Sequence, residues 1–283
     1  MQIANEREHR DIFLALATAV HGLGCINCFY MVVLTTYISV KSASTRFARF
    51  GYNFKFSNTI NLLIQLLYNL YAIFVDVLMW SNYARDIPLC YSELRSFIRA
   101  SAAVPFGWCH SFVYWTFHYI DPRALHDKNI PILPFWPKHL VNTVIPVILI
   151  LDIFVCRGDP VNNIAGGIVT FIYCMFYMIW LQIIYYMTNY WAVPFLANLS
   201  LMMKFSIFLS SMFVVYLFLL LGNAVTDLLW NDDSYSYKLY RRYLLREFGR
   251  SIHNHEDMGS EVQNLQMVLS ADQVKAKKLT ITK

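Results

Sequence analysis

The amino-acid sequence predicts an all-α polytopic membrane protein, built as a bundle of about six transmembrane helices. Of its 283 residues, 57% are hydrophobic and only 14% are charged, and the mean hydropathy is +0.42. Several apolar windows approach the length of about 20 residues that a helix needs to cross a bilayer. They cover residues 12–40, 57–80, 97–120, 139–156, 164–187 and 201–229. Apolar and polar residues do not alternate in these windows, which argues against the strands of a transmembrane barrel.

The first window predicts an uncleaved helix that follows a polar N-terminus, residues 1–11. Its apolar run is much longer than the roughly 7–15 residues of a signal-peptide core. The Lys and Arg residues of the loops favour a cytosolic location for both chain termini, because the side that holds the termini carries a basic cluster after the last window. The sequence does not distinguish the endoplasmic reticulum from the plasma membrane.

The second window carries a polar stripe along an otherwise apolar helix. Its members follow one another at steps of three, four, four and seven residues, which places them on one helical face. They are Asn58, Asn61, Gln65, Asn69 and Asp76. Because polar groups are costly against lipid, this face is expected to point toward protein or water. Interhelical hydrogen bonding and one wall of a polar cavity both explain the stripe, and the sequence leaves the two open.

The third window contains His110, which we expect to line the same polar cavity. A zinc hydrolase requires several ligands in a recognisable spacing such as H-E-x-x-H, and this spacing is absent. In the first window, Cys25 and Cys28 form a C-x-x-C with His21 one turn earlier. Without a second such pair, we interpret them as small buried residues of a bundle. We therefore expect neither a metal site nor a cofactor.

The fourth window opens with a polar cluster after a proline-rich loop. The loop, residues 121–138, contains four prolines and is expected to cap the bundle without forming regular helix through most of its length. In a six-span chain the second and fourth helices start on the same side, so His139 lies at a similar membrane depth to Thr59. A hydroxyl and an imidazole that meet there form a nucleophile–base pair. Alternatively, the polar residues of "FSNT" and "VNT" only cap the helix starts.

The C-terminal part of the chain differs in composition from the windows. Residues 231–252 read as a basic amphipathic juxtamembrane segment, with the stretch 238–250 on anionic lipid of the inner leaflet. Residues 253–283 are polar with little periodicity, which is typical of a disordered cytosolic tail. The net charge of +5 is accounted for by lipid contact, and no nucleic-acid partner is expected.

Most of residues 54–230 resembles the androgen-induced-gene family of multi-pass membrane proteins, which also contains the androgen-dependent regulator of tissue factor pathway inhibitor. The matching stretches are "FKFSNTINLLIQ", "IRASAAVPFGWCHSFVYWTFHYIDPRAL", "PFWPKHLVNTVIP" and "YMIWLQIIYYMTNYWAVPFL". The resemblance implies a threonine hydrolase that cleaves fatty acid esters of hydroxy fatty acids. Such a hydrolase uses a Thr at the start of its second helix and a His at the start of its fourth.

Carried onto this chain, the resemblance implies Thr59 as the nucleophile and His139 as the base. The register differs at both places. Aligned without gaps, Asn58 takes the position of the family's Thr, and one residue is a rotation of about 100° on a helix. The family's second His, the catalytic one, falls on Asn142 or Val141, whereas His139 matches the first His of the pattern.

Two hypotheses of function follow. The first is a membrane-embedded lipid ester hydrolase that acts through Thr59 and His139. The alternative is a catalytically inactive relative that serves as a lipid-binding or structural membrane protein. In both, the residues expected to line the cavity or to bind a lipid are Asn58, Asn61, Gln65, Asn142 and His110. A small-solute transporter is less favoured, because no inverted repeat is visible.

Overall fold

The computed structural model describes residues 2–43, 49–81, 89–121 and 135–231, and within these ranges it contains helices and no strand. The protein is an integral, multi-pass membrane protein of the predicted all-α class. Five of the described helical segments are long and apolar enough to cross a membrane: Ile12–Lys41, Ser57–Trp80, Phe135–Val155, Asn163–Thr188 and Leu201–Trp230. Residues 122–134 of the predicted cap and residues 232–283, which include the predicted amphipathic segment and tail, lie outside the described residues.

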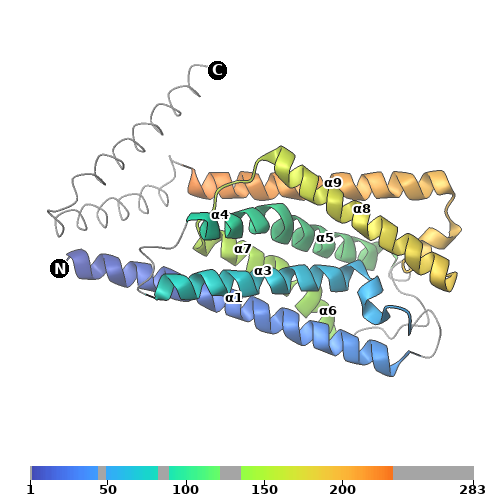
Figure 1. Cartoon of the computed structure of the whole chain (residues 1–283), viewed down its shortest axis with the longest axis horizontal. Helices are drawn as coiled ribbons and strands as arrows, with labels where there is room; N and C mark the ends of the chain where they lie inside the picture. The colour runs from blue at the N-terminus through green and yellow to red at the C-terminus, as the bar shows by residue number, and fades with distance from the viewer. Residues whose placement is uncertain (1, 44–48, 82–88, 122–134, 232–283) are drawn as a thin grey trace, which may run out of the picture. The chain divides into compact units, whose positions relative to one another are not determined.

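Helices α1 (Gln2–Lys41) and α3 (Ser57–Trp80) pack closely along one another (Figure 1). The close approach requires a residue without a side chain at Gly24. A Cβ atom at this position would lie 2.3 Å from the Asn69 side-chain oxygen. Small residues that let two backbones approach are a common means of helix association in membranes.

The third predicted window is a continuous helical run with an irregular centre. It consists of α4 (Leu89–Ile98), a π-helical segment (Arg99–Ala103) and α5 (Val104–Ile120). Pro105 follows the π segment and lacks the N–H that a regular helix would need there. The α-helical part has only 17 residues, which explains why this run is not among the five long segments.

The fourth window differs from the prediction because it contains two helices, α6 (Phe135–Asn142) and α7 (Val144–Val155), which meet at Thr143. The predicted window began at His139, whereas the helix begins four residues earlier. Pro146 lacks the N–H that would bind the Asn142 carbonyl, so regular helix cannot continue through this point. The Trp115 indole donates to that carbonyl instead, at 3.1 Å.

Two long helices complete the bundle. They are α8 (Asn163–Thr188) and α9 (Leu201–Trp230). The residue before each helix, Asn162 or Ser200, caps it with its side chain. α9 packs against α5 and α8. Helices α8 and α9 expose many apolar side chains, such as Phe171 and Phe213, which suits contact with lipid.

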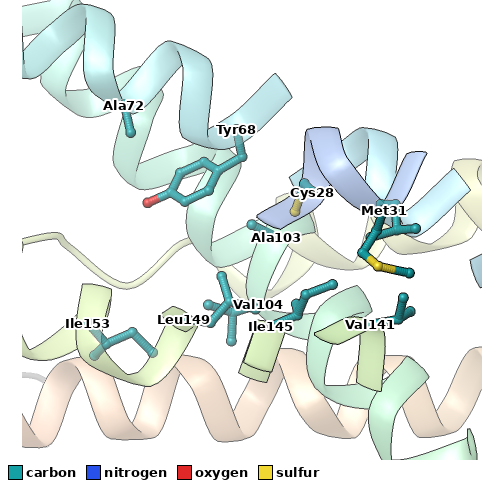
Figure 2. Packing of buried hydrophobic residues seen from close by; sticks show 11 residues of the cluster. Cys28, Met31, Tyr68, Ala72, Ala103, Val104, Val141, Ile145, Leu149 and Ile153 are labelled. Atoms are coloured by element: carbon teal, nitrogen blue, oxygen red, sulfur yellow. The ribbon is translucent and has the colours of Figure 1, made fainter. Parts of the chain in front are cut away.

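The apolar core lies where α1, α3, the π segment, α5, α6 and α7 converge (Figure 2). Its members include Cys28 and Met31 from α1 and Leu149 from α7. Cys28 therefore packs as a small core residue, as expected from the sequence. Gly107 lets this core close, because a Cβ there would lie 2.4 Å from Leu149 Cδ1.

A cluster of charged side chains is buried at one end of this core. The His21 ring lies between two carboxylates, with Nδ1 2.6 Å from Asp76 Oδ2 and Nε2 3.0 Å from Asp152 Oδ1. All three side chains are at most 1% exposed. The ring therefore connects α1 to α3 and α7 through their polar atoms.

Two arginines and a tyrosine complete this charged cluster. Arg95 Nη1 donates to Asp76 Oδ1 at 3.0 Å, and the Tyr68 hydroxyl donates to Asp152 Oδ2. Arg99 Nη1 donates to the Cys156 carbonyl at 2.7 Å and lies 3.9 Å from Asp152 Oδ1. Buried charges persist in an apolar interior when each one is paired and hydrogen-bonded, and these contacts supply that pairing.

Substitution of Gly24 by Val tests the close contact of α1 with α3. The new side chain meets the Asn69 amide, and overpacking of this kind costs about 1–3 kcal/mol. We expect a lower melting temperature for the purified protein in detergent. Gly22→Val is the matched control, because nothing lies within 4 Å of a Cβ at that position. Equal melting temperatures for the two variants would contradict the close approach.

Substitution of Asp76 by Ala tests the charged cluster, because it leaves His21 and Arg95 without their counter-charge. Loss of one partner of a buried pair costs roughly 3–5 kcal/mol. We expect most of the folded protein to be lost in a detergent thermal-shift measurement. The exposed carboxylate of Asp227 on α9 is the control, and Asp227→Ala should be nearly neutral. A neutral Asp76→Ala would show that the cluster contributes little stability.

Candidate functional site

A serine in the first turn of α3 pairs with a histidine of α5. Ser57 is the first residue of the helix, and the N-cap residue before it, Phe56, makes no side-chain cap. The Ser57 hydroxyl is directed to α5, where its Oγ lies 3.0 Å from His110 Nε2. The polar residues of "FSNT" thus do more than cap a helix start, because this hydroxyl is paired with an imidazole.

Tyr177 of α8 holds the backbone at the same position. The first N–H groups of a helix have no acceptor within the helix. The Ser57 N–H donates to the Tyr177 hydroxyl at 3.1 Å, so three helices meet at this serine. This contact fixes the start of α3 against α8 and orients the serine side chain toward His110.

Several buried polar atoms close in sequence to this group have no hydrogen-bond partner among the described residues, and three of them carry the argument. They are Asn58 Oδ1, Tyr114 OH and Tyr173 OH. Asn58 follows Ser57, Tyr114 lies one turn after His110, and Tyr173 lies one turn before Tyr177. Buried polar atoms are nearly always hydrogen-bonded in folded proteins. Unpaired ones close in sequence to a serine–histidine pair are therefore suited to the polar part of a ligand.

The two residues predicted to be catalytic lie in different surroundings. Thr59 is buried in the first turn of α3, and its N–H donates to the Phe56 carbonyl. His139 Nδ1 lies 3.1 Å from Thr143 Oγ1, and the ring packs on Trp115 and Phe135. No hydrogen bond joins Thr59 to His139 among the described residues, and their pairing stays a prediction.

Three further predicted cavity-lining residues lie on α3 and α6. Asn61 and Gln65 are buried, and Gln65 Nε2 donates to Asn61 Oδ1 and to the Ala103 carbonyl of the π segment. Asn142 is also buried, and its amide donates to the Lys138 carbonyl. The contact of Gln65 with Ala103 is an interhelical hydrogen bond of the polar stripe, which was one of its two interpretations.

The Ser57–His110 pair has the geometry of an activated nucleophile. An imidazole nitrogen within hydrogen-bonding distance of a hydroxyl can accept its proton as the oxygen attacks. No carboxylate contacts His110 among the described residues, and we call Ser57 and His110 the dyad. Arrangements of this kind support acyl transfer.

Sequence reasoning found the two members of the dyad separately and missed their pairing. His110 was assigned to the cavity, and Ser57 was considered only as a helix cap. Their separation of 53 residues on different helices leaves no spacing signal. The placement of α5 beside the start of α3 is what brings them together.

Comparisons with known proteins agree with the resemblance drawn from the sequence. The family model described as "FAR-17a/AIG1-like protein" matches residues 20–227. The human Androgen-induced gene 1 protein is 20% identical over 212 residues, which cover 72% of this chain and 88% of that protein. No solved structure matches the chain. Because the family match extends over well more than half of the sequence, the chain belongs to the FAR-17a/AIG1-like family.

Proposed function

We propose that this protein is a membrane-embedded lipid ester hydrolase in which Ser57 is the nucleophile and His110 is the general base. The observation that carries the proposal is the 3.0 Å contact between Ser57 Oγ and His110 Nε2. The pair Thr59 and His139, which the resemblance implies, has the same chemical roles but no such contact. Ser57 replaces Thr59 as the nucleophile two residues earlier in the same helical turn.

The reaction follows from the positions of these groups. Ser57 Oγ attacks the ester carbonyl carbon while His110 takes its proton. The carbonyl oxygen becomes an oxyanion, which the backbone N–H of Asn58 and the N-terminal dipole of α3 stabilise. The alcohol leaves with the proton from His110, and an acyl-serine forms. Water then attacks the acyl-serine with His110 as base, which releases the fatty acid and restores Ser57.

The substrate class rests on the apolar surroundings and on the family resemblance. Ser57 lies in the first turn of a helix that is long and apolar enough to span a membrane, so an ester with long acyl chains reaches it from the bilayer. Asn58 Oδ1, Tyr114 OH and Tyr173 OH offer hydrogen bonds to the polar part of the substrate. The resemblance implies a fatty acid ester of a hydroxy fatty acid as the specific substrate.

The second candidate is a lipid-binding relative without catalysis. The observation that favours it is the departure at the two positions where the family resemblance places Thr and His, which hold Asn58 and either Asn142 or Val141. Neither an amide nor an aliphatic side chain can replace these groups in acyl transfer. In this function the same buried polar atoms bind a lipid headgroup, and the serine–histidine contact only holds α3 against α5.

Ser57→Ala and His110→Gln test the proposed dyad in the purified full-length protein. We expect each to lower kcat for hydrolysis of a fatty acid ester of a hydroxy fatty acid by at least ~10³-fold, because nucleophile and base act as one unit. We also expect a fluorophosphonate probe to label the wild-type protein and not Ser57→Ala. Ser111→Ala, which removes a buried α5 hydroxyl bonded to the Gly107 carbonyl, should keep both activities.

Thr59→Ala and His139→Ala separate the two possible nucleophile–base pairs. Full activity in both variants supports Ser57 and His110. Loss of activity in both, with Ser57→Ala unaffected, would assign the reaction to the pair that the resemblance implies. A wild-type protein that binds the ester but does not hydrolyse it or any other long-chain ester would leave the lipid-binding function.

A further inference from the structure

We propose that the charged cluster at the other end of the bundle is a binding site for a Zn²⁺ ion, with His21 Nε2, Asp152 Oδ1 and Cys156 Sγ as its ligands. These three atoms lie within 4.8 Å of one another, and all three residues are buried. The proposed hydrolase does not use the cluster. Asp76 follows Ser57 by 19 residues on α3, which corresponds to roughly 28 Å at about 1.5 Å per residue.

The distances are close to those of a tetrahedral site. Zn²⁺ binds nitrogen and oxygen at about 2.0–2.2 Å and thiolate sulfur at about 2.3 Å, so neighbouring ligand atoms lie about 3.3–3.8 Å apart. Here His21 Nε2 is 3.0 Å from Asp152 Oδ1 and 3.8 Å from Cys156 Sγ. Asp152 and Cys156 are one turn apart at the end of α7, and α1 supplies the histidine.

The hydrogen bonds around the ligands are those that a zinc-bound histidine normally makes. A metal-binding imidazole donates its other ring N–H to a carboxylate, which fixes the tautomer. His21 Nδ1 lies 2.6 Å from Asp76 Oδ2, and Arg95 holds the second oxygen of the same carboxylate. On the ligand Asp152, the second oxygen accepts from the Tyr68 hydroxyl.

A metal ion also resolves a conflict at the imidazole ring. Both ring nitrogens face carboxylate oxygens, but a neutral imidazole has a single N–H to donate. With Zn²⁺ at Nε2, the one N–H remains at Nδ1 for Asp76. Without the ion, the ring must carry a second proton to satisfy Asp152.

The exchange of protons for the metal leaves the charge of the cluster unchanged. The metal-free cluster with an imidazolium has three cationic and two anionic side chains, which leaves one positive charge in excess. Zn²⁺ brings two positive charges and displaces two protons, one from His21 and one from the Cys156 thiol. No additional charge is therefore buried when the ion binds, and Arg95 and Arg99 do not oppose it by net charge.

The donor set favours zinc over the hard cations Mg²⁺ and Ca²⁺. Imidazole, carboxylate and thiolate suit a borderline-soft ion, whereas Mg²⁺ and Ca²⁺ prefer oxygen alone. The ion would join α1 to the end of α7 in the interior of the protein. Three protein ligands leave the fourth position of a tetrahedral ion to water. The role we assign to the ion is to hold these two helices together.

The direct test is metal analysis of the full-length protein, purified with a tag that contains no histidine. We expect about one zinc ion per chain by plasma mass spectrometry. Cobalt added to the metal-depleted protein should give the thiolate charge-transfer band and the visible bands of a tetrahedral site. A wild-type protein with no zinc and no cobalt–thiolate band would overturn the proposal and leave an ion-pair network.

Matched variants assign the ligands. Cys156→Ser should lose the zinc and the cobalt–thiolate band, whereas Cys174→Ser, a buried cysteine of α8, should retain both. Asp76→Asn, beside the histidine, should weaken zinc affinity about 10–100-fold. Retention of stoichiometric zinc and of the band by Cys156→Ser would reject this site. The cobalt spectrum of the wild type keeps the test decisive if the variants fail to fold.

Discussion

His21 connects three helices because its ring lies between the carboxylates of Asp76 and Asp152, and the packing of the bundle depends on this contact. In the apolar interior of a membrane protein there is little water to compete for these polar atoms. Separation of α1 from α3 and α7 would leave charged groups unpaired at high cost. The apolar core beside the ring and the close approach at Gly24 both require α1 to sit in this one register.

The polar groups of the bundle are divided between its two ends, and the two groups differ in kind. One end contains hydroxyl, imidazole and amide groups, several of them without a partner among the described residues. The other end contains carboxylates and guanidinium groups that are almost completely paired. A paired cluster favours rigidity, and unpaired neutral groups favour ligand binding. Under the proposed function, one end of α3 contributes stability and the other end contributes the chemistry.

The sequence was sufficient to predict the fold class, because each long apolar window indicates one helix and its approximate length. The polar stripe on α3 was also predictable, and Asn61, Gln65, Asn69 and Asp76 are buried as its spacing indicates. The partners of that stripe were not predictable, because the rotation of one helix against a distant one leaves no local pattern. Asp152 offered a signal that was not used: a single carboxylate in the apolar run "VILILDIF" requires a buried partner. The Ser57–His110 pair offered none, since each residue has an ordinary role when considered alone.

The position of Ser57 along α3 determines how a lipid would approach it. The first turn of a spanning helix lies near the boundary of the hydrocarbon layer, at the depth where the ester groups of lipids reside. A lipid could therefore present its ester to the hydroxyl while both acyl chains stay in the bilayer. Such a protein would have no need to extract its lipid into water, and access would be lateral, between helices, at one leaflet only.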